Sequence, residues 1–173
     1  MSEKRVLVLG AGPGGYAAAF LAADLGMKVT LVDVGSQPGG VCLHRGCIPS
    51  KTLLHNARLI HETREAKTWG LDFGEPKLDL EAIRKWKNQV IGKMASGLVQ
   101  LCKQRGVEFI QGKGVFKDSQ TIEVSGKGRF QYDYCVLAVG SSPAIPAEFK
   151  EVDLLDSTRA LELEEIPRRL LIV

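Results

Sequence analysis

The sequence has no long apolar run, no block of like charges and no low-complexity tract. No apolar stretch approaches the roughly 20 residues that a membrane-spanning helix needs, so the sequence predicts no membrane segment. The formal net charge is only +3 in 173 residues, and the basic residues form no run longer than a pair or so. Because nucleic-acid binding needs a clustered basic face, this charge pattern argues against a nucleic-acid partner.

The amino-terminal residues also do not form the charged-then-apolar pattern of a secretory signal peptide. They lead straight into a short apolar run. The sequence therefore predicts a cytoplasmic location, where a close pair of cysteines is more often catalytic or metal-binding than structural. The length, the 45% hydrophobic content and the 25% charged content suit one globular α/β domain with a real core.

What the sequence does contain is a dinucleotide-binding pattern. Residues 6–9 predict a buried strand, G-x-G-x-x-G covers residues 10–15, and an alanine-rich helix follows to Leu25. A second apolar run, residues 29–32, ends at Asp33. The glycines allow a tight turn, close approach of backbone to a pyrophosphate, and close packing of helix on strand. The helix N-terminus then faces the phosphates, and Asp33 lies at the spacing expected for an acid that binds an adenosine ribose.

A second motif, GGVCLHRGCIPSK at residues 39–51, holds two cysteines with four residues between them, Cys42 and Cys47. Pro49 suits the first turn of a helix, so Cys47 is expected near a helix N-terminus, whose dipole favours a thiolate. Lys51 follows one turn later. We interpret the pair as a redox-active disulfide.

Other interpretations of the cysteines stay open at this point. The pair could be plain buried thiols, or it could form a zinc site together with Cys102 and Cys135. We favour neither and expect no metal, because Cys102 and Cys135 stand isolated in apolar stretches. A domain that binds NAD in place of FAD is a further alternative, although a disulfide needs a nearby electron acceptor to be useful.

The rest of the chain predicts an α/β fold of the Rossmann-like, FAD-binding type, with a parallel sheet, long helices and a small β-meander insertion. Helical spacing predicts one helix from residue 52 towards Gly70 and another over residues 79–104, with Asp79 as its N-cap. Strands are predicted at residues 107–115, 121–124 and 130–139. The last strand ends in small residues, which can bring backbone near a ligand at the carboxyl edge of a sheet.

Three segments resemble one family, the flavin-dependent pyridine nucleotide–disulfide oxidoreductases. They are VLVLGAGPGGYAAAFLAADLG at residues 6–26, the cysteine motif at residues 39–51, and YDYCVLAVGSSPAIP at residues 132–146. The CIPSK ending resembles in particular the lipoamide (dihydrolipoyl) dehydrogenases. Mercuric or glutathione reductase-like enzymes of the same family are alternatives, as is a flavin-binding piece without catalysis.

The resemblance implies a set of site residues within an FAD-binding domain, residues 1–150. Cys42 would exchange with the substrate sulfur, Cys47 would lie next to the flavin, and Lys51 would lie beside the flavin ring. With these three, the residues that would contact FAD are Gly10, Gly12, Pro13, Gly14, Asp33, Gly40, Val41, Gly114, Val139, Gly140 and Ser141. Relatives usually have Thr in place of Val139 and often Asn in place of His44, to which we assign no role.

For a whole enzyme, the resemblance implies oxidation of dihydrolipoamide to lipoamide through the disulfide and FAD, with hydride passed to NAD. It also implies a homodimer that serves the lipoyl domains of 2-oxoacid dehydrogenase complexes, with a His–Glu acid–base pair from the partner subunit. Residues 151–168 would connect to an NAD-binding domain whose first strand is residues 169–173. We therefore expect a piece of a longer protein, without NAD-linked turnover of its own.

Overall fold

A computed structural model describes residues 4–173, and its centre is a parallel sheet in the order β3-β2-β1-β7. The sheet consists of β1 (Arg5–Leu9), β2 (Lys28–Asp33), β3 (Glu108–Gln111) and β7 (Tyr134–Leu137). Helix α1 (Pro13–Asp24) connects β1 to β2, as the glycine motif predicts. This arrangement confirms the predicted Rossmann-like α/β class.

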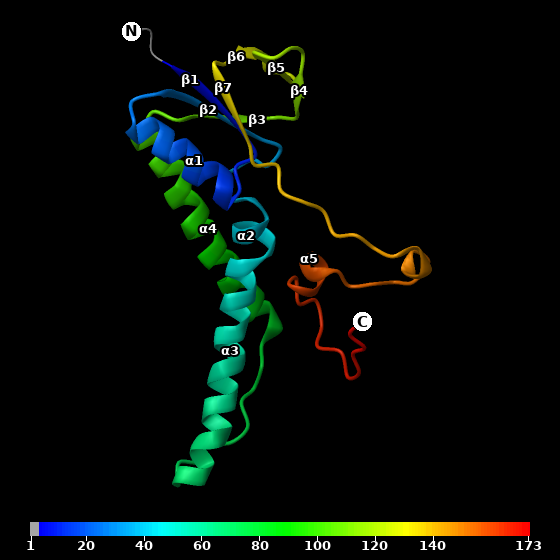
Figure 1. Cartoon of the computed structure of the whole chain (residues 1–173). Coiled ribbons are helices and arrows are strands. Elements are labelled where there is room, and N and C mark those ends of the chain that lie inside the picture. Colours follow the sequence, from blue (N-terminus) through cyan, green and yellow to red (C-terminus); the bar gives the residue numbers. More distant parts are fainter. Residues whose placement is uncertain (1–3) are drawn as a thin grey trace.

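Helices and a meander cover opposite faces of this sheet (Figure 1). Val6 and Val8 of β1 pack in one core with α1 and with Cys102 of helix α4 (Leu80–Gln104). Leu7, between them, packs in a second core with Ile122 of the meander. Side chains of a strand alternate between the faces, so a continuous apolar run is what burial on both faces requires.

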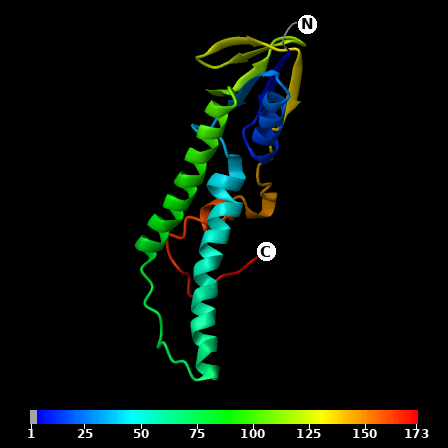
Figure 2. The same ribbon diagram turned by 90° about the vertical axis from the view of Figure 1, so that its left-hand side faces the viewer.

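The cysteine motif folds into the start of a helical region. Helix α2 (Gly40–Arg45) is short, and α3 (Cys47–Glu65) follows it and continues into a 3₁₀ turn, η1 (Ala66–Trp69). The sequence did not predict α2, whereas α3 begins at Cys47 with Pro49 in its first turn, which agrees with the predicted position of Cys47 near a helix N-terminus. Figure 2 shows α3 and α4 side by side as a hairpin that extends from the sheet. Asp79 caps α4 as predicted, because its Oδ1 accepts the backbone N–H of Ala82 at 3.0 Å.

Two of the predicted strands were wrong in extent, because each is split between two sheets. The predicted strand at residues 107–115 is β3 and then β4 (Gly114–Phe116), and the one at residues 130–139 is β6 (Gly128–Gln131) and then β7. Strands β4 and β6 flank β5 (Thr121–Val124) in an antiparallel meander. The strand-like alternation of residues continues where the chain passes from one sheet to the other. The sequence pattern alone therefore cannot show where a strand changes its pairing partner.

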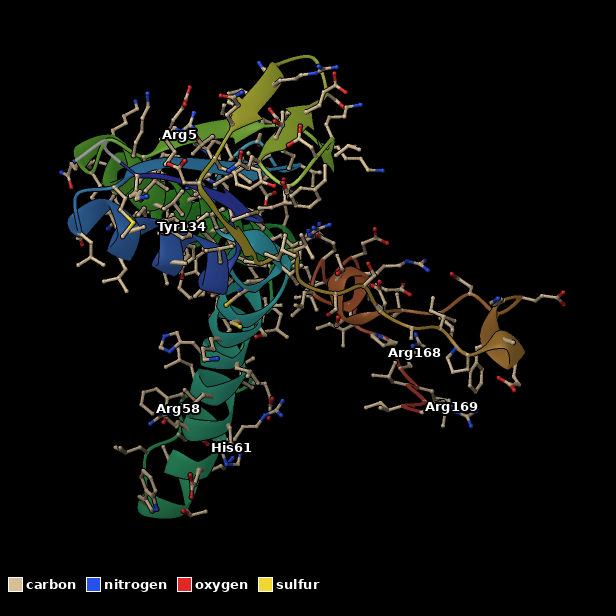
Figure 3. The ribbon with its side chains drawn as sticks, turned by 45° about the horizontal axis from the view of Figure 1, so that its top comes forward. Arg5, Arg58, His61, Tyr134, Arg168 and Arg169 are labelled. Atoms are coloured by element: carbon tan, nitrogen blue, oxygen red, sulfur yellow. The ribbon has the colours of Figure 1, made fainter. Side chains whose placement is uncertain are left out.

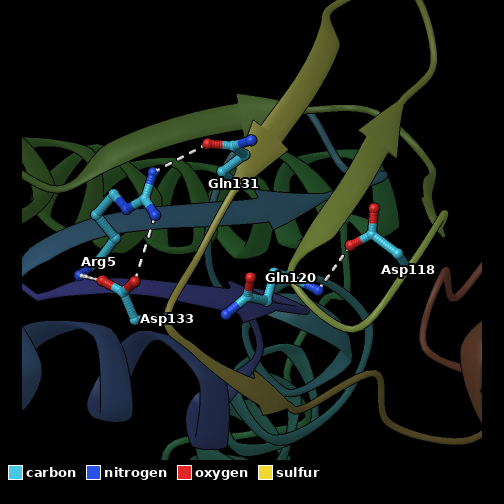
Figure 4. Close-up of polar contacts among 5 residues, drawn as sticks. All are labelled: Arg5, Asp118, Gln120, Gln131 and Asp133. Carbon is cyan, nitrogen blue, oxygen red and sulfur yellow. Dashed lines mark hydrogen bonds and ion pairs between the residues drawn. The ribbon is translucent and has the colours of Figure 1, made fainter.

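The connection from the meander back to the parallel sheet is fixed at Asp133 (Figure 4). Its Oδ2 accepts the backbone N–H of Arg5 at 2.8 Å, and its Oδ1 accepts from Arg5 Nη2 at 3.3 Å. Arg5 Nη1 also reaches Gln131 Oε1 at 3.4 Å. The hydrogen bonds from Arg5 hold the pKa of Asp133 below its usual range. The start of β1 is thereby tied to the start of β7.

The segment after β7 extends away from the helices and returns towards them near α5 (Figure 1); its regular elements are η2 (Ala147–Phe149) and α5 (Ser157–Ala160). Helix α4 holds it through Lys87, which is 2% exposed and donates from Nζ to the carbonyl oxygen of Leu161 at 2.7 Å. Residues 170–173 are exposed and pair with neither sheet. The division at residues 150 and 168 stays a prediction. Over residues 4–173, no helix is both long and apolar enough to cross a bilayer.

Candidate active site

The glycine loop lies at the carboxyl end of β1 and is packed closely at Gly10 and Gly15. Gly10 has φ +100°, and a Cβ there would lie 2.1 Å from the carbonyl oxygen of Ala138. A Cβ at Gly15 would lie 1.7 Å from the carbonyl oxygen of Gly10, so α1 packs directly on the loop. Gly12 is the N-cap of α1 and supplies no side-chain hydrogen bond. The N–H groups of the first turn of α1 are therefore available to an anion.

Asp33 shapes this loop, a role that the sequence did not predict. Its Oδ2 accepts the backbone N–H of Ala11 at 2.6 Å, and its Oδ1 accepts that of Gly35 at 2.7 Å. A carboxylate oxygen has more than one acceptor site. Asp33 can therefore hold the loop and still accept a hydrogen bond from a ribose hydroxyl.

The cysteine motif is joined directly to the glycine loop. The backbone N–H of Gly39 donates to the carbonyl oxygen of Ala11 at 2.8 Å. Gly40 has φ +59°, and a Cβ there would lie 2.5 Å from Cα of Gly12. The N-termini of α1 and α2 are therefore neighbours. Gly39 opens the predicted cysteine motif but was not among the predicted site residues, although two consecutive glycines there are a signal of close backbone packing.

Cys42 on α2 and Cys47 at the first residue of α3 are brought together as free thiols. Cys47 lies close enough to Cys42 to be the first cause of the raised pKa of the Cys42 thiol. Gly46 permits this approach, because a Cβ there would lie 3.0 Å from the carbonyl oxygen of Val41 and 3.3 Å from Cα of Cys42. The structure thus holds the dithiol form of the predicted pair. Cys47 is the more exposed of the two.

Replacing Gly46 with alanine is expected to separate the two thiols. The added methyl group would press on backbone of α2, which cannot move aside as a flexible side chain can. A disulfide needs Cβ atoms about 3.5–4.5 Å apart, so we expect the fraction of Cys42–Cys47 disulfide in a fixed glutathione buffer to fall about tenfold. Gly92→Ala, at a helical glycine with open space around it, is the matched control. An unchanged disulfide fraction in Gly46→Ala would contradict the packing argument.

The environment of Cys42 disfavours its thiolate. The hydrogen bond with Cys47, and then burial, raise the pKa of Cys42, while the positive charge of Lys51 lowers it by less. A raised pKa means that Cys42 is protonated at neutral pH. Before Cys42 acts as a nucleophile, its thiol must therefore lose its proton to an acceptor or move away from Cys47.

The pH dependence of alkylation checks this environment. Only the thiolate reacts, so the iodoacetamide rate at Cys42 is expected to rise through a midpoint above that of an ordinary thiol. Cys47→Ala removes the largest cause of the raised pKa, so its midpoint is expected to be lower than in the wild type. Peptide mass spectrometry after timed alkylation measures both rates. Equal midpoints in the two proteins would show that Cys47 does not control the ionisation of Cys42.

The remaining predicted residues lie around the same edge of the sheet or project from it. Val139, Gly140 and Ser141 lie just beyond β7, after Ala138, and are exposed. Gly114 lies close to the end of β1, since a Cβ there would be 3.0 Å from Leu9 Cδ1. Val41 and Lys51 are exposed on α2 and α3. The assignment of Ser141 to the flavin site stays a prediction.

A metal site finds no support in the described part of the chain. Cys102 lies on α4 and Cys135 on β7, and burial raises the pKa of both thiols. Among residues 4–173, no three His, Cys, Asp or Glu side chains gather closely enough to hold a metal ion.

Comparison with known proteins agrees with this geometry. The pyridine nucleotide-disulphide oxidoreductase family matches residues 4–173. The chain belongs to this family. Its membership confirms the resemblance that the glycine motif, the cysteine motif and the segment after β7 carry. The paired thiols and the glycine loop described above lie within the residues that match this family.

Curated relatives of the chain are dihydrolipoyl dehydrogenases. The protein from Vibrio cholerae is 45% identical over 99% of this chain, and the one from Haemophilus influenzae is 42% identical over 99%. Dihydrolipoyl dehydrogenase 2 of Haloarcula marismortui is 39% identical over 97%. The chain spans 37% of the length of each of these relatives.

A solved structure supports the fold. The HOCl-induced flavoprotein disulfide reductase RclA from Escherichia coli superposes with a TM-score of 0.77 over 94% of this chain and 35% of that one. The two are 23% identical in sequence. The likeness therefore concerns the arrangement of the elements.

Proposed function

We propose that this chain carries the FAD-binding site and the redox-active disulfide of a dihydrolipoyl dehydrogenase. The reaction is oxidation of dihydrolipoamide to lipoamide, with NAD as the final acceptor. One observation carries the proposal: α2, which holds Cys42, packs against the start of α3 at Gly46 and Cys47 and against the dinucleotide-type glycine loop at Gly12, so the two cysteines lie together beside that loop. The names of the relatives, up to 45% identical to this chain, support the substrate.

The residues at the carboxyl edge of the sheet fit a flavin adenine dinucleotide. The uncapped first turn of α1 suits the pyrophosphate, and space is open at Gly14, where a Cβ would meet nothing within 4 Å. Asp33 suits the adenosine ribose. The other residues that would hold FAD are Gly10, Gly12, Pro13, Gly40, Val41, Cys47, Lys51, Gly114, Val139, Gly140 and Ser141. When bound, FAD would supply the two-electron chemistry that reoxidises the dithiol.

The chain's own residues perform the sulfur exchange. A thiolate of dihydrolipoamide attacks the sulfur of Cys42 in the Cys42–Cys47 disulfide, and Cys47 leaves as a thiolate. The second substrate thiolate then attacks the substrate sulfur of this mixed disulfide, which releases lipoamide and the Cys42 thiolate. The substrate loses two electrons, and the protein disulfide gains them. The positive end of the α3 dipole stabilises the departing Cys47 thiolate.

The proposal extends to the setting of this reaction. NAD, a homodimer and the lipoyl domains of 2-oxoacid dehydrogenase complexes are the acceptor, assembly and partners that the relatives' name supports. A cytoplasmic location suits a cysteine pair used for catalysis, because stable structural disulfides are rare in that compartment.

A single-turnover experiment tests the function. The purified chain is oxidised, freed of oxidant and mixed with excess dihydrolipoamide under anaerobic conditions without NAD. We expect about one lipoamide for each Cys42–Cys47 disulfide, because each disulfide accepts one electron pair. A yellow flavin absorbance, or its appearance on reconstitution with FAD, is the second expected result. A disulfide that dihydrolipoamide leaves intact would overturn the proposal.

A further inference from the structure

We propose that His44 is a positioning residue that sets the geometry of the Cys42–Cys47 pair. The inference rests on the proposed function, because it concerns the same thiol–disulfide reaction. His44 lies two residues after Cys42 on α2, and its side chain is half-buried. Its Nε2 lies 3.2 Å from the carbonyl oxygen of Pro38. Because a carbonyl oxygen only accepts hydrogen bonds, Nε2 carries a proton and donates it to Pro38.

The partner of His44 is firmly placed. The Pro38 side chain is fully buried, and the next residue, Gly39, donates its backbone N–H to Ala11 at 2.8 Å. A Cβ at Gly39 would lie 3.0 Å from His44 Nε2, so the imidazole packs closely on this turn. His44 therefore connects the cysteine helix to a turn that is itself bonded to the glycine loop.

Helix α2 depends on such contacts for its position. It has six residues and no side-chain cap at its N-terminus, and isolated helices shorter than about 12 residues are marginal in water. Leu43, which is 4% exposed, anchors it through burial. The bond from His44 to Pro38 adds a directional restraint. His44 lies only two residues from Cys42. Its bond to Pro38 limits how far α2 rotates, and thus how far the Cys42 sulfur moves from Cys47.

Loss of this restraint affects the disulfide more than the dithiol. A disulfide tolerates only a narrow range of Cβ separations, whereas two thiols remain stable when they drift apart. We expect His44→Ala to lower the equilibrium constant for Cys42–Cys47 oxidation about tenfold, which is about 30 mV for a two-electron couple. His44→Gln is expected to keep this constant within about threefold of the wild type, because its amide N–H can replace the imidazole donor.

The experiment is a redox titration of the full chain in glutathione buffers, quenched with acid and alkylated. Trypsin cleaves after Arg45 and after Lys51, so an intact disulfide joins the peptides of residues 29–45 and 46–51. The ratio of joined to alkylated peptides gives the equilibrium constant without any assay of turnover. His61→Ala is the matched control, because His61 lies far along α3 from the sheet and its side chain is 78% exposed (Figure 3).

Each possible result either supports or overturns the positioning role of His44. A His44→Ala constant equal to that of the wild type overturns the positioning role, and so does a His44→Gln constant as low as that of His44→Ala. If circular dichroism shows that His44→Ala is unfolded, His44→Leu, which fills the space without a donor, is compared with His44→Gln, and equality again overturns the role. A wild type that never joins the two peptides overturns the proposed function itself, and the inference with it.

Discussion

Serine at Cys42 or at Cys47 is expected to abolish exchange with dihydrolipoamide. No disulfide can then form between α2 and α3, and a serine hydroxyl does not replace a thiolate as nucleophile or leaving group. We expect lipoamide formation per protein to fall by more than about a thousandfold, as for other residues that react as a unit. The single-turnover assay described above measures it. Cys135→Ala is the matched control, since Cys135 lies on β7 outside the pair.

The two variants also separate the roles of the thiols. If Cys42 is the thiol that meets substrate, Cys47→Ser leaves a Cys42 thiolate that attacks glutathione disulfide, expels one glutathione thiolate and forms a mixed disulfide with no second thiol on either side to resolve it. We expect this adduct in the intact mass of Cys47→Ser, and much less of it in Cys42→Ser. The reverse result would exchange the two roles, and Cys47 is the more exposed of the two.

Alanine at Gly15 is expected to cause the largest loss of stability among single-methyl additions near the site. Its Cβ would lie 1.7 Å from the carbonyl oxygen of Gly10 and 3.4 Å from Cβ of Ala138. Backbone on that side cannot move away without shifting α1 from β1. Overpacking a core commonly costs about 1–3 kcal/mol and occasionally more, and a backbone clash belongs at the upper end. We expect a loss of about 3 kcal/mol in the free energy of unfolding.

Urea unfolding measures the free energy of unfolding of Gly15→Ala, and flavin absorbance measures how much flavin the variant retains. The same shift of α1 would move the first-turn N–H groups, so Gly15→Ala is expected to retain less flavin as well. Gly92→Ala on α4 meets nothing within 4 Å, and alanine there is expected to stabilise by about 0.5–1 kcal/mol, because glycine is a poor helix residue. A Gly15→Ala chain as stable as Gly92→Ala would show that the loop and helix do not pack as described.

Features with a strong local signal were predicted well. The buried strands β1 and β2 follow apolar runs that require burial on both faces, and α4 follows a clear cap at Asp79. The short helix α2 was not predicted, because six residues with glycine at the start have little helical tendency of their own. Tertiary contacts stabilise it. The sequence also did not predict that two of the strands are each divided between the two sheets. The alternation of residues along a strand carries no information about which strand it pairs with.

The sequence by itself determined the fold class, the glycine loop, the two cysteines and the family, because each depends on residue type at fixed spacing. Only the tertiary structure decided that Asp33 holds the loop through Ala11, that Gly46 lets α3 begin against α2, and that His44 reaches Pro38. These contacts are lost when neighbouring elements shift by more than a few tenths of an ångström. Local patterns specify which elements form, whereas packing between them sets where each functional group lies.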